Sequence, residues 1–301
     1  MPFEFTLPSF AKINWTLRIL GKRDDGYHDL CTLFQTISLQ DALSFSENDE
    51  IILTCDDVSV PTNEQNLIIR AAKALQNKFG INKAARLHLE KRIPTPGGLG
   101  GGSSNAAVAL IGLAKLWEIN IKPEDMASIA AELGSDVPFF LFGGTAIGTA
   151  RGDVIELAPD IVKKNMMVVT PKVNVSTGGA FSRLDSLNLT KEDPESILRV
   201  CRFMAESGDL GNKTLINDFE ASVFLVEPEI ARVKETLLDL GAIQAMMSGS
   251  GASVFAMFDK EETRQAALKA LEIESNWRKF AVATVSREEY CRHLGLYYST
   301  N

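Results

Sequence analysis

Five glycines fall within six residues of this chain, from Gly97 to Gly102, and two serines and an apolar stretch of helical character follow them. Each glycine costs conformational entropy on folding, so this density indicates a need for a bare, tightly bent backbone. A loop that enters a helix presents unpaired N–H groups, and the helix dipole adds partial positive charge. This arrangement favours binding of an anion, most often a phosphate. A plain glycine-rich linker is the alternative, although a linker rarely runs into a strongly apolar helix.

Two well-known phosphate loops do not fit these glycines. The P-loop requires a lysine directly after its glycines, and none follows here. The fingerprint GxGxxG finds its first two glycines in Gly98 and Gly100, but Ser103 stands at the third place. That fingerprint also belongs to an early βαβ unit, whereas this loop lies near residue 100. The glycines therefore predict a phosphate site of another kind, to which Ser103 and Ser104 could add hydroxyl groups.

A carboxylate and an ammonium stand in short polar motifs elsewhere in the chain. Asp136 and Pro138 belong to the segment SDVP, which has the pattern of a helix N-cap. Lys12 and Asn14 occupy polar positions of the stretch 10–20, whose period of two predicts a half-buried strand. From the residues alone, Asp136 could be a plain helix cap and Lys12 a solvated strand lysine.

The composition excludes several classes of protein. The net charge of -8 over 301 residues argues against a general binder of nucleic acid or anionic membranes, which is expected to be basic. No run of about 18 apolar residues predicts a membrane span, and the N-terminus lacks the pattern of a secretory signal. The four cysteines form no CxxC pair, so we expect free thiols in a cytoplasmic protein. The three histidines are too scattered for a histidine-rich zinc site.

Strand and helix patterns are mixed along the whole chain. Strands are predicted at 10–20, 30–39, 41–47, 50–57, 85–93, 145–157 (a hairpin), 164–171, 252–258 and 280–288. Helices are predicted at 63–80, 104–119, 122–134, 228–241 and 261–272. Because strict βαβ alternation is missing, we predict an α+β fold. A second unit begins near residue 160, so we predict two domains, residues 1–158 and 159–301.

The glycine loop resembles the ATP-phosphate motif of the GHMP small-molecule kinases. The resemblance runs from Pro94 through Gly98 and Leu99 to Ala107. Two further segments resemble the first and third motifs of that family: PSFAKINWTLRILGKRDDGYHDLCTLFQ at 8–35 and MMSGSGASVFAMF at 246–258. Together with GSDVPFFLFGG and NDFE, they are most similar to the branch that acts on 4-diphosphocytidyl-2-C-methyl-D-erythritol (CDP-methylerythritol). This match covers nearly the whole chain in order.

The resemblance implies a reaction, a fold and a set of partners. ATP, with Mg²⁺, would donate its γ-phosphoryl group to the 2-hydroxyl of the methylerythritol unit, a step of the non-mevalonate route to isoprenoids. The N-terminal domain would be like ribosomal protein S5 domain 2 and the C-terminal domain ferredoxin-like, with the active site between them. The implied partners are ATP and CDP-methylerythritol, not nucleic acid or membrane. The expected state is a monomer or a weak homodimer.

The same resemblance implies catalytic roles. Asp136 matches the catalytic aspartate of the family and would accept the proton of the attacking hydroxyl. Phosphoryl transfer leaves little covalent chemistry to the protein, so position and charge stabilisation would dominate. Lys12 would stand beside Asp136 as its electrostatic partner, and Asn14 would hydrogen-bond the substrate.

Aromatic residues would bind the cytidine base. Tyr27 and His28 follow a tight turn at Gly26, and the resemblance implies that Tyr27 stacks on the base while His28 hydrogen-bonds its edge. Phe181 falls where the family places a second aromatic ring, so the base would lie between two rings. Thr177 is a polar candidate in the same loop. Either aromatic side chain could instead only cover the core.

For ATP, the resemblance implies contacts from the glycine loop and from one residue before an earlier helix. The residues concerned are Pro94, Gly98, Leu99, Gly100, Gly101, Gly102, Ser103, Ser104 and Asn66. Ser104 would also give Mg²⁺ a protein ligand; this ion normally keeps several waters. The third-motif segment 248–251 would line the cleft beside the loop, unless it is only a tight turn.

Two alternatives remain at this stage. The chain could be another GHMP kinase that acts on homoserine or a mevalonate derivative, but the GYH segment and Phe181 favour a cytidine substrate. It could also bind a ligand without catalysis. The joint presence of Lys12, Asp136 and three glycine motifs argues against that second alternative.

Overall fold

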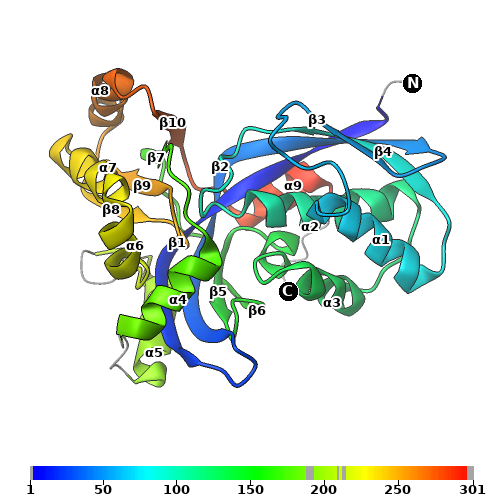
Figure 1. The fold of residues 1–301 in the computed structure, drawn as a ribbon, viewed down its shortest axis with the longest axis horizontal. Coiled ribbons are helices and arrows are strands. Elements are labelled where there is room, and N and C mark those ends of the chain that lie inside the picture. Colours follow the sequence, from blue (N-terminus) through cyan, green and yellow to red (C-terminus); the bar gives the residue numbers. More distant parts are fainter. Residues whose placement is uncertain (1–2, 188–192, 209, 212–214, 297–301) are drawn as a thin grey trace.

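The computed structural model describes residues 3–187, 193–208, 210–211 and 215–296. Within these residues the strands form two sheets, and two units lie side by side around them (Figure 1). The larger sheet has the order β3–β4–β2–β5–β6, and β1 pairs with β2 in antiparallel register. Its strands are β1 (Phe5–Lys22), β2 (His28–Asn48), β3 (Ile52–Cys55), β4 (Ala84–Glu90), β5 (Thr145–Thr149) and β6 (Val154–Ala158).

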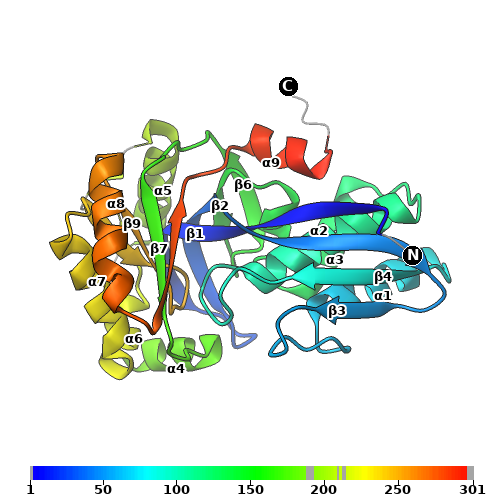
Figure 2. The ribbon, with the colours of Figure 1, turned by 90° about the horizontal axis from the view of Figure 1, so that it is seen from above.

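Helices α1, α2 and α3 cover one face of the larger sheet (Figure 2). They are α1 (Leu67–Phe79), α2 (Gly101–Leu116) and α3 (Pro123–Leu133), and the short 3-10 helix η1 (Pro138–Leu141) follows. Helix α2 is apolar on most of its circumference because it is buried between the sheet and its neighbours. Helix α1 ends at Gly80, whose left-handed φ of 60° confirms the predicted glycine stop.

The second unit contains the smaller sheet, with the order β10–β7–β9–β8. Its strands are β7 (Met166–Pro171), β8 (Gln244–Met247), β9 (Val254–Met257) and β10 (Trp277–Val282). Its helical segments are α4 (Thr177–Leu187), α5 (Pro194–Ser207), α6 (Glu220–Val226), α7 (Pro228–Asp239), α8 (Glu261–Ala270) and η2 (Leu271–Ile273), and α9 (Arg287–Leu294) follows β10. The predicted α+β class is confirmed.

The two units share a core rather than a bare linker. Trp15 of β1 packs edge-on against Phe255 of β9, with ring centroids 5.3 Å apart. Helix α9 returns to the first unit, where the Tyr290 hydroxyl donates to the Phe140 carbonyl at 2.5 Å. The proposed division between residues 158 and 159 stays a prediction. Helix α9, from the far side of that division, packs in the core of the first unit.

Five predicted elements differ clearly from those observed. The strands predicted at 30–39 and 41–47 are one strand, β2, and the last predicted strand ends at Val282 and gives way to α9. Helix α2 begins three residues before the predicted Ser104, within the glycines. The stretch 10–20 is buried on both faces up to Leu17, because its apolar face packs on the second unit while Lys12, on the polar face, lies against Asp136 and the glycine loop.

No helix in the described part of the chain is long and apolar enough to span a membrane.

Candidate active site

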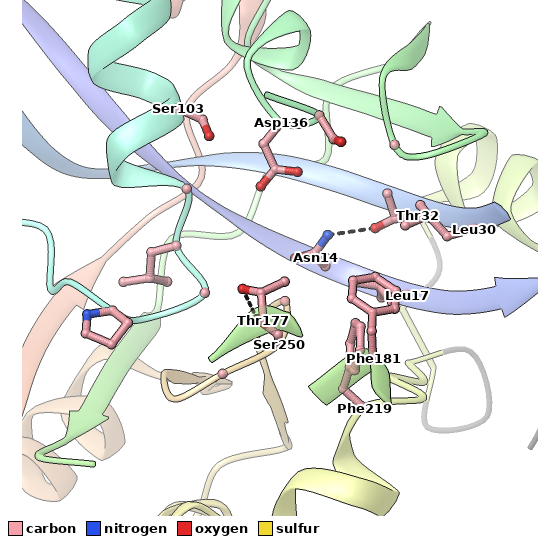
Figure 3. A pocket seen from close by; sticks show the side chains of 18 of the residues that line it. Asn14, Leu17, Leu30, Thr32, Ser103, Asp136, Thr177, Phe181, Phe219 and Ser250 are labelled. Atoms are coloured by element: carbon pink, nitrogen blue, oxygen red, sulfur yellow. Dashed lines mark hydrogen bonds between the residues drawn. The ribbon is translucent and has the colours of Figure 1, made fainter. Parts of the chain in front are cut away.

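A cleft of about 790 Å³ opens where the two units meet. Strands β1 and β2 form its floor, the glycine loop, α2 and the third motif stand at one end, and α4 stands toward the other (Figure 3). Most of the predicted site residues line it: Lys12, Asn14, Tyr27, His28, Pro94, Gly98, Leu99, Gly100, Gly101, Gly102, Ser103, Asp136, Thr177 and Phe181. We call residues 94–103 and 248–251 the loop end, and Tyr27, His28, Phe181 and Phe219 the aromatic end.

Backbone hydrogen bonds fix the loop end. The carbonyls of Gly97 and Leu99 accept from the N–H groups of Ser253 and Lys12, at 3.1 and 2.9 Å. The Gly98 carbonyl accepts from the Ser248 hydroxyl at 3.0 Å. With these oxygens held by the protein, the first N–H groups of α2 give the cleft an electropositive end. This is the physical requirement for binding a phosphate.

Two of these glycines are required by space as well as by backbone conformation. Gly98 and Gly100 both have a left-handed φ of 69°. A Cβ on Gly98 would lie 2.1 Å from the Ser248 carbonyl oxygen, and one on Gly100 would lie 2.9 Å from the Phe140 ring. The third motif therefore packs directly on the glycine loop and is more than a surface turn.

Asn217, in the NDFE segment, holds the third motif in place. Its amide donates to the carbonyls of Met247 and Gly249, at 2.7 and 2.8 Å, and its own oxygen accepts from the Phe219 N–H. One buried side chain thus fixes part of the loop end and the start of the segment that carries Phe219.

A polar chain crosses the floor of the cleft. Lys12 Nζ lies 3.5 Å from the Asp136 carboxylate and donates to Asn14 Oδ1 at 2.8 Å. Asn14 Nδ2 donates to the Thr32 hydroxyl at 2.7 Å (Figure 3). Lys12 is only 3% exposed, whereas the Asp136 side chain is 34% exposed. The ammonium is therefore held behind a carboxylate that is accessible from the cleft.

Asp136 is the only carboxylate among the described residues that line the cleft. It lies in a turn between Gly134, where α3 ends, and Pro138, where η1 begins. No side chain caps η1, so the structure does not make Asp136 the helix cap that its sequence pattern permits. A carboxylate in this position can accept a proton from a bound hydroxyl group.

The aromatic end is built from side chains. The His28 and Phe181 rings stack with centroids 4.9 Å apart, and Phe181 meets Phe219 edge-on at 4.8 Å. Tyr27 is 55% exposed and has the Arg151 guanidinium 5.1 Å from its ring centroid. The structure thus stacks Phe181 on His28, and the binding of the base between Tyr27 and Phe181 stays a prediction.

Two predicted residues do not reach the cleft, which corrects their expected placement. Ser104 is fully buried and its hydroxyl accepts from Ser9 at 2.8 Å, so it is directed away from a metal or phosphate. Asn66 caps α1: its side chain accepts from the Ile68 N–H and donates to the Pro61 carbonyl. Their neighbours Ser103 and Leu67 line the cleft instead.

Sequence reasoning missed several residues of the cleft. Thr32 is a hydroxyl in an otherwise apolar strand segment, and Arg151 is a cation in the turn between β5 and β6. Phe219 stood inside a recognised motif without an assigned role. Only Thr32, a polar residue within an apolar run, could have been found from the sequence. Arg151 and Phe219 reach the cleft through contacts between distant segments.

The cleft fits a Mg²⁺ ion that arrives with a nucleotide. The described residues contain no group of three acidic, histidine or cysteine side chains that could hold a metal. The side chains with oxygen atoms that line the cleft include Asp136 and Ser103. Mg²⁺ needs few protein ligands when phosphates and water supply the others.

Comparison with known proteins agrees with this geometry. Residues 66–144 match the GHMP kinases N terminal domain and residues 188–275 match the GHMP kinases C terminal domain. The 4-diphosphocytidyl-2-C-methyl-D-erythritol kinase of Thermodesulfovibrio yellowstonii is 40% identical over 270 residues, which cover 89% of this chain and 94% of that protein. The enzyme of the same name from Syntrophus aciditrophicus is 39% identical over 276 residues, with 91% and 97% covered.

Solved structures agree as well. A crystal structure of 4-(cytidine 5'-diphospho)-2C-methyl-D-erythritol kinase has a TM-score of 0.77 at 30% identity and covers 93% of this chain and 99% of its own. Homoserine kinase from Cytophaga hutchinsonii has a TM-score of 0.68 at 20% identity, with 95% and 97% covered, which shows the common fold alone. The chain therefore belongs to the 4-diphosphocytidyl-2-C-methyl-D-erythritol kinase family, within the GHMP kinases.

Proposed function

We propose that this protein transfers the γ-phosphoryl group of ATP to the 2-hydroxyl of CDP-methylerythritol. The observation that carries the proposal is the position of Asp136, the one carboxylate among the described lining residues, with the Lys12 ammonium 3.5 Å away. Close relatives that bear the name of this enzyme support the choice of substrate.

In the proposed reaction, Asp136 accepts the proton of the substrate hydroxyl while the hydroxyl oxygen forms a bond to the γ-phosphorus. The bond from the γ-phosphorus to the bridging oxygen breaks, and ADP leaves with that electron pair. Lys12 places a positive charge beside the carboxylate and the reacting oxygen, and Asn14 orients the hydroxyl.

At the loop end, the N–H groups of α2 and the Ser103 hydroxyl bind the ATP phosphates. The phosphates would chiefly hold Mg²⁺, with Ser103 or Asp136 as protein ligands, and the ion would supply positive charge to the transferred group. This assignment replaces Ser104, whose hydroxyl is buried on Ser9.

At the aromatic end, Phe181 and His28 bind the cytosine, with Tyr27 and Thr177 at its margin. The Tyr27 ring is more than half exposed and lies beside Arg151, whereas the Phe181 ring packs edge-on against Phe219. We further propose that the protein acts in the cytoplasm, a reducing compartment that its free cysteines suit, and that it is a monomer or weak homodimer.

An ADP-release assay with Mg-ATP tests the substrate. CDP-methylerythritol, homoserine and mevalonate are compared at equal concentrations, and CMP is added as a competitor. We expect turnover with CDP-methylerythritol alone, with inhibition by CMP that is competitive against this substrate and not against ATP. Turnover with homoserine or mevalonate and none with CDP-methylerythritol would contradict the proposal.

A further inference from the structure

One fully buried carboxylate, Asp41 of β2, lies behind the loop end without lining the cleft. Its Oδ1 accepts from the backbone N–H groups of Arg92 and Ile93, at 2.7 and 2.8 Å. Its Oδ2 accepts from Lys91 Nζ at 2.8 Å and from Asn105 Nδ2 at 2.9 Å. Four donors thus fill the acceptor capacity of one carboxylate.

These donors stand on both sides of the glycine loop. Lys91 to Ile93 form the chain that enters the loop, and Asn105 lies in the first turns of α2, which leaves it. Asn105 Nδ2 also donates to Ser9 of β1 at 2.8 Å, and Ser9 donates to Ser104. The two ends of the loop are therefore joined through a single side chain of the sheet.

We propose that Asp41 is a positioning residue for ATP: it fixes the distance between the two ends of the phosphate loop and so sets where the N–H groups of α2 meet the phosphates. This inference rests on the proposed use of the loop end for ATP. It assigns a role to Asn105 as well, as the link from Asp41 to α2. Neither side chain lines the cleft.

Whether ATP affinity falls or rises when Asp41 is replaced distinguishes a positioning role from a purely electrostatic one. Lys91 Nζ lies 3.2 Å from where a Cβ on Gly101 would stand, so the ion pair adjoins the start of α2. Removing the negative charge of Asp41 leaves the Lys91 charge uncompensated there, which by Coulomb attraction alone would strengthen phosphate binding. A positioning role requires the opposite result, because the loop loses its anchor.

The test is the affinity of the intact protein for ATP and for CMP, measured by calorimetry on Asp41→Asn and Asn105→Ala. An asparagine at 41 sets an NH₂ group against two donors that need an acceptor. Alanine at 105 removes only the link to α2 and suits a helix. We expect the ATP dissociation constant to rise about tenfold for Asp41→Asn and about threefold for Asn105→Ala, with CMP affinity unchanged.

Glu229→Gln is the matched control. Glu229 accepts from Arg232 and from the Trp277 indole in the second unit, away from the cleft, so this change also removes a carboxylate from an ion pair. We expect thermal destabilisation with unchanged affinity for both nucleotides. If Asp41→Asn does not fold, Asn105→Ala alone decides the question.

Unchanged or tighter ATP binding by the two variants, or an equal loss of ATP and CMP affinity, would overturn the inference. A wild type that binds ATP but does not phosphorylate CDP-methylerythritol would overturn the proposed substrate and leave the role of Asp41 to be decided by ATP affinity. A wild type that binds no ATP would overturn both.

Discussion

At the loop end of the cleft the binding surface is mainly backbone, whereas at the aromatic end it is side chain. The carbonyls of Gly97, Gly98 and Leu99 are all engaged by the protein, and there is no space for a Cβ on Gly98. At the other end, Tyr27 is more than half exposed and Phe181 is partly buried. A phosphate can be bound by fixed N–H groups, but a flat base needs rings that adjust around it.

The comparison predicts different sensitivities to substitution. A backbone site fails when its chain moves by about 1 Å, since such a displacement can cost about 100-fold in rate. A site made of rings loses only the contact that is removed. The expected effects of substitutions on catalysis and binding therefore decrease from the loop end to the aromatic end.

The largest effect is expected for Gly98→Ala. The new Cβ would lie 2.1 Å from the Ser248 carbonyl oxygen, and the left-handed φ adds strain, so the loop or the third motif must shift. We expect kcat/KM for ATP to fall about 100-fold. The control is Gly21→Ala in β1, which does not line the cleft and where a Cβ meets nothing within 4 Å; it should stay within about twofold of the wild type. Equal effects of the two substitutions would contradict the proposed sensitivity of the loop end.

A smaller and more selective effect is expected for Phe181→Ala. Loss of the ring removes stacking with a base, worth about 1–3 kcal/mol, so KM for CDP-methylerythritol should rise about tenfold or more while KM for ATP stays constant. Phe181→Leu keeps apolar bulk against Phe219 and should lose the same affinity if the ring face is what matters. A rise in KM for ATP would show that the two ends are not independent.

The smallest effect is expected for Tyr27→Ala, at about threefold in KM for CDP-methylerythritol, because this ring is exposed and already contacts Arg151. Tyr27→Phe should be close to the wild type. A loss as large as that of Phe181→Ala would instead favour the two-ring sandwich that the sequence resemblance implies.

Sequence reasoning predicted the loop end well because its signal is local. Glycines are placed where a left-handed or crowded backbone needs them, and a helix must follow them, so the site could be read from a dozen residues. The start of α2 was placed three residues late, because glycine has low helix propensity although packing holds Gly101 and Gly102 helical here.

The rest depended on contacts between distant segments. Lys12 and Asn14 looked like solvated strand residues, but Asp136, the glycine loop and the third motif stand around that face and make it the floor of the cleft. Asp41 was the first residue of the strand predicted at 41–47 and had no assigned role, and its four donors come from segments about 50 and 60 residues away. The spacing of the residues does not predict such a contact, nor that Ser104 is buried on Ser9 while Ser103 lines the cleft.

The most direct test of the central claim is Asp136→Asn, assayed for ADP release with CDP-methylerythritol and for binding of ATP and CMP, with Ser135→Ala as the neighbouring control in the cleft. We predict that kcat falls by about 100- to 10,000-fold, as expected for loss of a general base, while both dissociation constants stay within about threefold. The control should keep most of its activity. An Asp136→Asn protein that turns over within about tenfold of the wild type would contradict the assignment of Asp136 as the base.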